Sequence, residues 1–198
     1  MVEPSDNLQA VFEKAIDTAK KLHHEYLTIE HLLFAMLLEE TFTKTVQGYG
    51  ANVDAFRKNL VDYLENKCAE ITVPDVVVKP KKTQTVERVL NRAFTQVLFN
   101  GRQRIEPTDV FLSMMGEKRS WVFYYTQQAE IDKDKFADYL NNTIEEEEEE
   151  TESTPAKNDL PWKDDEETSK PSKNNYELKA PVKKSKADKF DALFEDEN

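Results

Sequence analysis

Three histidines lie close together near the start of the chain and raise the question of a metal site. His23 and His24 are adjacent, and His31 follows them within the stretch HHEYLTIEH. Zinc sites on a helix use the spacing HExxH, which places two imidazoles on one helical face. The stretch here does not have that spacing. We therefore expect no metal site.

The residues that nucleophilic catalysis and nucleotide binding require are also missing. Cys68 is the only cysteine and has Lys67 as its single basic neighbour, so we expect an ordinary thiol. The sequence has no GxxxxGK[ST] loop, and its four glycines are wrongly placed to surround a phosphate. No carboxylate lies on an apolar helix face, where burial would raise its pKa. We expect no catalytic residue, no cofactor and no enzymatic activity.

The single cysteine and the amino terminus bear on the compartment. One cysteine excludes an intramolecular disulfide and fits a reducing environment. The opening MVEPSDNLQA lacks the basic and apolar regions of a signal peptide. No apolar run approaches the roughly 18 residues of a membrane span. These features favour a cytoplasmic protein that makes no use of a membrane.

The charge of the chain is concentrated at its carboxyl end. Formal net charge is −12, and residues 145–198 hold 9 Lys against 18 Asp and Glu, a net of −9. An acidic segment repels the phosphates of nucleic acids, whereas basic segments bind them by releasing counterions. We therefore expect no nucleic-acid partner.

The front of the chain contains one pattern twice. Residues 8–37 match residues 86–115 at an offset of 78, so that Lys14 corresponds to Arg92 and Met36 to Met114. A closing stretch at 52–64 is matched by 130–140, which is two residues shorter. Agreement of helix, turn, helix and closing helix at a fixed offset indicates an internal duplication.

Apolar spacing within each copy predicts helices, and strand-like alternation is almost absent. Thr28 is the expected N-cap of the second helix, and Pro107 fits the first turn of its counterpart. We predict an all-α domain over residues 1–143, built from two pseudo-twofold four-helix repeats at about 7–67 and 83–143. Each repeat alone is marginal in size, so the eight helices should share one core. Residues 68–82 carry two prolines and no helical period, which favours an extended connector.

From residue 144 to 198 the chain changes character. It is polar, acidic and punctuated by proline, and such a segment buries too little apolar surface to fold alone, so we predict a disordered acidic tail. Residues 185–195 differ, because Phe190, Leu193 and Phe194 share one face of a short helix. Spacing of this kind is typical of anchors for the groove of a second, unknown protein partner. The alternative is a frayed end with incidental aromatic residues.

The stretch FEKAIDTAKKLHHEYLTIEHLLFAML resembles the opening of the Clp N-terminal domain, the repeat domain that precedes the ATPase modules of ClpA/ClpC-type AAA+ unfoldases. The resemblance covers roughly residues 7–143 and is carried by these residues: Ala15, Ala19, His24, Glu25, Thr28, Glu30, His31, Leu32 and Leu33 in the first copy, and Thr83, Arg88, Val89, Leu90, Arg92, Ala93, Gly101 and Arg102 in the second. The chain departs from the family at Glu106-Pro107, which replaces a capping threonine, and by the absence of Walker motifs.

The resemblance implies a domain that docks adaptors and substrates for an unfoldase. In the ClpA branch the adaptor is ClpS, so the implied partners are a ClpS-like adaptor, a substrate or the Clp unfoldase itself. The implied partner-binding residues are Glu25, Thr28, Glu30, His31, Thr83, Arg88 and Arg92. Each also has a plainer interpretation. Glu30 and His31 fit an ordinary helix start, Thr83 fits a cap, and the two arginines lie off the apolar face at positions that are usually solvated.

Three functional hypotheses remain open at this level. The first is a stand-alone docking module that modulates Clp proteolysis, for example one encoded by a phage. The second is a truncated ATP-binding subunit of a Clp protease, whose motor modules lie outside this chain. The third is an interaction protein unrelated to proteolysis, because a fold alone does not fix a function.

Overall fold

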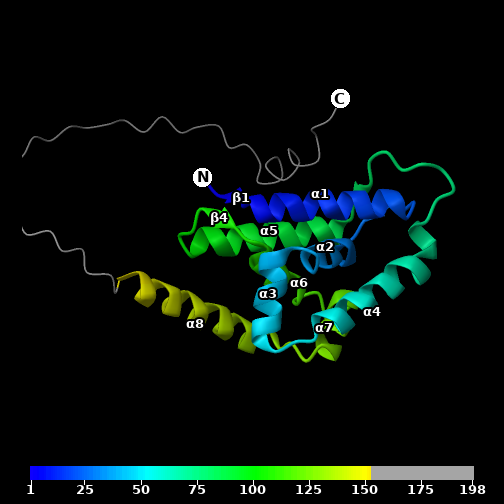
Figure 1. Cartoon of the computed structure of the whole chain (residues 1–198). Coiled ribbons are helices and arrows are strands. Elements are labelled where there is room, and N and C mark those ends of the chain that lie inside the picture. The colour runs from blue at the N-terminus through cyan, green and yellow to red at the C-terminus, as the bar shows by residue number, and fades with distance from the viewer. Residues whose placement is uncertain (153–198) are drawn as a thin grey trace, which may run out of the picture.

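The computed structural model describes residues 1–152, with side chains up to Thr143 (Figure 1). The first repeat contains α1 (Asp6–Lys21), α2 (Ile29–Met36), α3 (Glu40–Tyr49) and α4 (Val53–Asn66). The second contains α5 (Gln84–Phe99), α6 (Pro107–Met114), α7 (Trp121–Gln128) and α8 (Lys133–Glu152). Four two-residue strands accompany them: β1 (Glu3–Pro4), β2 (Tyr26–Leu27), β3 (Lys81–Lys82) and β4 (Arg104–Ile105). The predicted all-α fold of two four-helix repeats is confirmed.

The first helix of each repeat begins in the same way. Ser5 is the N-cap of α1, and its hydroxyl accepts a hydrogen bond from the amide of Leu8 at 3.2 Å. Thr83, which lies 78 positions later, caps α5 and accepts from the amide of Val86 at 3.3 Å. Each hydroxyl satisfies one amide that the first helical turn leaves without a partner.

The short strands exchange partners between the repeats, which the sequence did not predict. β1 pairs in parallel with β4, with Glu3 opposite Arg104. β2 pairs in parallel with β3, with Tyr26 opposite Lys81. The offset of 78 relates β1 to β3 and β2 to β4, so the two ribbons are equivalent under the pseudo-twofold relation. They bring the cap of α5 next to the start of α2.

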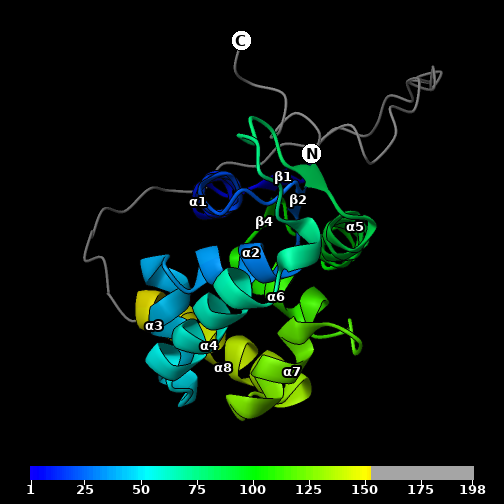
Figure 2. The same cartoon turned by 90° about the vertical axis from the view of Figure 1, so that its right-hand side faces the viewer.

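One core runs through both repeats. The helices form layers, with α1 and α5 side by side on one side, α2 and α6 beneath them, and α4 and α7 below (Figures 1 and 2). Phe42 of α3 and Phe111 of α6 contact edge to face at 5.3 Å, and Phe111 meets Phe136 of α8 at 5.4 Å. Nearly all buried apolar residues of both halves belong to a single cluster. The predicted sharing of the core is therefore seen directly.

The ends of the predicted segments need two adjustments. The connector contains a 3-10 turn at Ala69–Ile71 as well as extended stretches, and its Thr72 forms a β-bridge with His24. The helix α8 continues to Glu152, whereas the sequence placed the change of character at residue 144. The departure at Glu106 does not remove a cap, because the carboxylate of Asp109 accepts the amide of Glu106 at 2.8 Å. The motif Phe190, Leu193 and Phe194 lies outside the described residues.

Candidate functional site

A cleft of about 410 Å³ opens where the two repeats meet. It lies between the first turn of α2, the start of α5 and the loop that leads into α7. We call it the inter-repeat cleft, and its lining residues are Thr28, Ile29, Glu30, Thr83, Thr85, Arg88, Glu117, Lys118, Arg119, Ser120 and Trp121. Four of the residues predicted to bind a partner are therefore brought together here, from positions more than 50 apart in the sequence: Thr28, Glu30, Thr83 and Arg88.

Glu30 forms the floor of this cleft and is 6% exposed. Burial raises the pKa of its carboxyl group above the ordinary value. Hydrogen bonds from its own amide, from the Thr28 hydroxyl and from the amides of Trp121 and Val122 act in the opposite direction. The carboxyl group therefore lies between the amino-terminal ends of α2 and α7, where amides and helix dipoles favour a negative charge. The expectation that no carboxylate is buried with a raised pKa is wrong at this residue.

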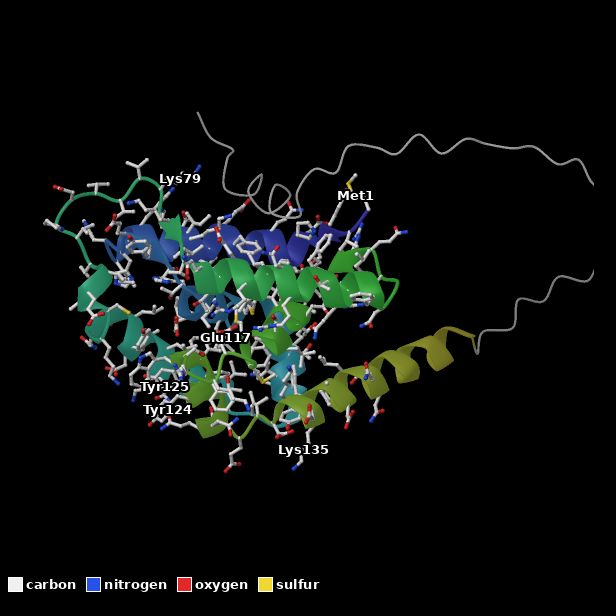
Figure 3. The ribbon with its side chains drawn as sticks, turned by 180° about the vertical axis from the view of Figure 1, so that it is seen from behind. Met1, Lys79, Glu117, Tyr124, Tyr125 and Lys135 are labelled. Carbon is white, nitrogen blue, oxygen red and sulfur yellow. The ribbon has the colours of Figure 1, made fainter. Side chains whose placement is uncertain are left out.

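Glu117 holds the two arginines of α5. Its carboxylate accepts from Arg88 Nε at 3.1 Å and Nη2 at 2.8 Å, and from Arg92 Nη2 at 2.7 Å. These bonds and charges lower the pKa of Glu117 to about 2. Arg92 also donates to the Ser113 hydroxyl and to the Ser113 carbonyl, each at 2.9 Å. Arg92 is thus a structural tie between α5 and α6, while Arg88 remains on the wall of the cleft (Glu117 is labelled in Figure 3).

His31 lies beneath the cleft and has no exposed surface. Its Nδ1 accepts the amide of Thr28 at 3.1 Å, so the ring carries its proton on Nε2. That Nε2–H donates to Nδ1 of His24 at 2.8 Å. Burial, together with the neighbouring His24, lowers the pKa of His31 to about 3, and burial also lowers the pKa of His24. Both imidazoles are therefore neutral at pH 7, and their role is structural: His31 holds Thr28, and His24 holds His31.

Glu25, the remaining predicted residue, lies outside the cleft lining. Its carboxylate pairs with the Lys81 ammonium at 2.7 Å, beside the β2–β3 ribbon. Lys81 in turn lies over the ring of Tyr26, at 5.8 Å from its centroid. Both side chains are largely exposed to solvent, so the ion pair contributes little to stability.

Seven of the eleven lining residues were not predicted from the sequence, and three of them, Lys118, Arg119 and Trp121, give the cleft much of its chemical character. Lys118 and Arg119 are exposed on its rim, and Trp121 is 43% exposed at one end. The sequence does show a difference between the repeats that could have identified Lys118 and Arg119. The turn GEKRSW after α6 is basic, whereas the corresponding turn of the first repeat has no basic residue before Lys44. With Arg88, these side chains give the rim a cationic character in a chain of net charge −12. The arrangement suits acidic or polar groups of a protein partner.

Residues 1–152 also bear on metal binding and on membranes. Within residues 1–152, no group of three or more His, Cys, Asp and Glu side chains is placed to hold a metal ion. No helix in that same part has the length and apolar character needed to cross a membrane.

Comparison with known proteins gives consistent results. The sequence matches the Clp repeat (R) N-terminal domain over residues 3–129. A ClpA homolog protein of Fuscovulum blasticum is 21% identical over 153 residues, covering 77% of this chain and 19% of that protein. The chain thus spans about a fifth of the length of this relative.

Solved structures share the fold at low sequence identity. The Hsp104 N-terminal domain of Candida albicans aligns with a TM-score of 0.60 at 14% identity, over 69% of this chain and 88% of that one. The N-terminal domain of the chaperone ClpD of Arabidopsis thaliana aligns with a TM-score of 0.56 at 13% identity, over 72% and 95% of the two chains.

Proposed function

The chain belongs to the Clp repeat N-terminal domain family, and we propose that it docks a protein partner through the inter-repeat cleft. Domains of this family are non-catalytic interaction modules of Clp ATPases, which bind adaptors and substrates. The partner proposed for this chain is an adaptor of the ClpS type, carrying acidic or polar groups to the rim. The chain itself acts by binding and carries out no chemistry.

The observation that carries this proposal is the assembly of the cleft from both repeats. Its floor is the buried Glu30 of the first repeat, and its rim is formed by Arg88, Lys118 and Arg119 of the second. Opposite charges across an interface raise the association rate and select the partner. The partly exposed indole of Trp121 adds an aromatic surface of the kind that often dominates binding energy.

The chain's place in the Clp system has two versions. In the first, the domain acts alone and modulates proteolysis by occupying the adaptor or the substrate of an unfoldase. In the second, it is the amino-terminal part of an ATP-binding subunit, in keeping with the 19% of the ClpA homolog that it spans. The coding sequence after Asn198 separates these versions, because only the second requires Walker motifs downstream.

The docking proposal is tested with charge reversals that leave the helices intact. The variant Lys118→Glu/Arg119→Glu should bind a purified ClpS-type adaptor at least tenfold more weakly in calorimetry, which corresponds to about 1.4 kcal/mol. The matched control is Lys133→Glu/Lys135→Glu, which changes the same charge on exposed positions of α8 (Lys135 is labelled in Figure 3). Equal affinity of the two variants would place docking elsewhere.

A further inference from the structure

A second hollow lies on the first repeat, lined by residues in or next to α1, α2 and α4. It has a volume of about 240 Å³, and its apolar lining is Leu22, Phe34, Leu38, Val61 and Leu64. Leu38 is 42% exposed, so its side chain is accessible at the edge of the hollow. We call this hollow the first-repeat groove, and it shares no residue with the inter-repeat cleft.

The second repeat fills the equivalent space with its own side chain. At the offset of 78, Lys14 corresponds to Arg92 and Leu38 to Gly116. Arg92 lies back against α6, and a side-chain Cβ on Gly116 would be 3.5 Å from its guanidinium. In the first repeat Lys14 is exposed, and Leu38 occupies the position that Gly116 has in the second repeat. Among the described residues, the space that Arg92 covers in the second repeat is therefore left open in the first repeat.

The acidic end of the chain offers a matching segment. Residues 185–198 carry five Asp and Glu against two Lys, and Phe190, Leu193 and Phe194 are spaced to share one helical face. The groove is bordered by Lys14 and Lys21, with Glu65 as its single carboxylate. Both the apolar anchors and the net charges are therefore complementary.

The chain between Glu152 and Phe190 is long enough to bring this segment to the groove. Fully extended, each residue spans about 3.3–3.6 Å, which gives a reach of more than about 100 Å. A body of this size has a radius of gyration of about 15 Å, so every face lies within reach. Docking within one chain also needs less intrinsic affinity than docking between chains, because the tether raises the effective concentration.

We propose that residues 185–198 dock as an amphipathic helix in the first-repeat groove of the same chain, with Phe190, Leu193 and Phe194 as anchors. The groove is then the binding site of this motif, and no separate partner is needed for it. The inter-repeat cleft stays open in the docked state, because the two hollows are lined by different residues.

The test places the photo-crosslinker benzoylphenylalanine at Phe190 in the full chain and maps the products by mass spectrometry. Irradiation should label peptides that contain residues 14–22, 34–38 or 61–65. The same crosslinker at Tyr176, earlier in the acidic segment, is the positional control and should not label these peptides. The variant Leu38→Glu should lose the labelling, whereas Leu98→Glu should keep it, because Leu98 is a 49% exposed leucine on α5.

Three results would overturn the proposal. The first is unchanged labelling in Leu38→Glu, with circular dichroism showing that the helices are intact. The second is labelling spread over the surface in the same way from positions 190 and 176. The third is formation of covalent dimers in place of labelling within one chain, which would identify a second copy as the occupant.

Discussion

The carboxyl group of Glu30 links the two repeats as well as lining the cleft. It is 6% exposed and is hydrogen-bonded by amides at the starts of two helices, one from each repeat. Its position at the floor of the cleft makes the fold and the surface interdependent. A substitution that changes docking here can therefore act through the structure, so a docking test needs rim residues instead.

We predict opposite outcomes for two substitutions of Glu30. Glu30→Gln keeps an oxygen acceptor for the amides and should lower the free energy of unfolding by about 1 kcal/mol or less. Glu30→Lys places an unpaired ammonium among helix amino termini and should lower it by more than about 3 kcal/mol. Urea unfolding measures both values. Similar values for the two variants would show that the carboxyl group does not hold the start of α7.

The buried pair His24 and His31 should make the fold sensitive to mild acid. In the folded state burial lowers the pKa of both rings, that of His31 to about 3, whereas both rings bind protons below about pH 6.5 in the unfolded chain. Because the unfolded state then binds more protons, stability falls as the pH drops through this window. For His31 the loss between pH 7 and pH 5 is about 2 kcal/mol.

The double variant His24→Gln/His31→Gln tests this pH dependence. It should be less stable than the wild type at pH 7 but should lose less stability between pH 7 and pH 5. The raised pKa of Glu30 has the opposite sign and is common to both proteins, so it cancels in the comparison. His23→Gln, at an exposed position, is the control and should keep the wild-type slope. Equal slopes for all three proteins would contradict the assignment of the buried rings.

At the scale of elements, the helices were predictable and the strands were not. Apolar spacing located the helices, and a small polar residue marked the start of α2 at Thr28. A strand of two residues has no alternation to recognise, and its partner lies about 55 to 100 residues away. The offset of 78 relates one ribbon to the other, but it does not show which strands pair. One ribbon could therefore be predicted only after the pairing of the other was known.

The candidate site was predictable in part for a similar reason. The identities of Thr28, Glu30, Thr83 and Arg88 came from a family resemblance, and the structure places all four around one cleft. The burial of Glu30 depends on the start of α7, which arrives from the other repeat. The residues next to Glu30 in the sequence do not predict that contact. For the same reason the role of Arg92, which is fixed by Ser113, was not visible.

The equivalent caps of α1 and α5 allow a matched prediction. Ser5→Ala and Thr83→Ala should each lower the free energy of unfolding by about 1 kcal/mol, because each removes the hydroxyl acceptor of a helix start. Only Thr83→Ala should also weaken adaptor binding, since Thr83 lines the cleft and Ser5 does not. Thermal unfolding and calorimetry provide the two readouts. Equal effects of both variants on binding would mean that the loss is one of stability alone.

At the scale of the whole molecule, duplication explains both surfaces. The shared core makes the two repeats one body, and their junction creates the inter-repeat cleft. Sequence differences between the two copies then make the inter-repeat cleft basic at its rim and leave the first-repeat groove apolar and open. The second repeat supplies the basic turn at Lys118 and Arg119, and the first leaves its apolar groove uncovered beside Leu38. A symmetric duplicate would have neither difference.

Docking of a protein partner in the inter-repeat cleft can be observed residue by residue. The most direct measurement is amide chemical-shift mapping of the isotope-labelled full chain during titration with a purified ClpS-type adaptor. We predict that the perturbed amides cluster at residues 28–30, 83–88 and 117–121, and that the perturbations fade as salt screens the rim. Perturbations centred on α8 or on the face of α1, α2 and α4 would place docking outside the cleft. Cleft amides that stay unchanged at saturating adaptor would show that the cleft does not bind it.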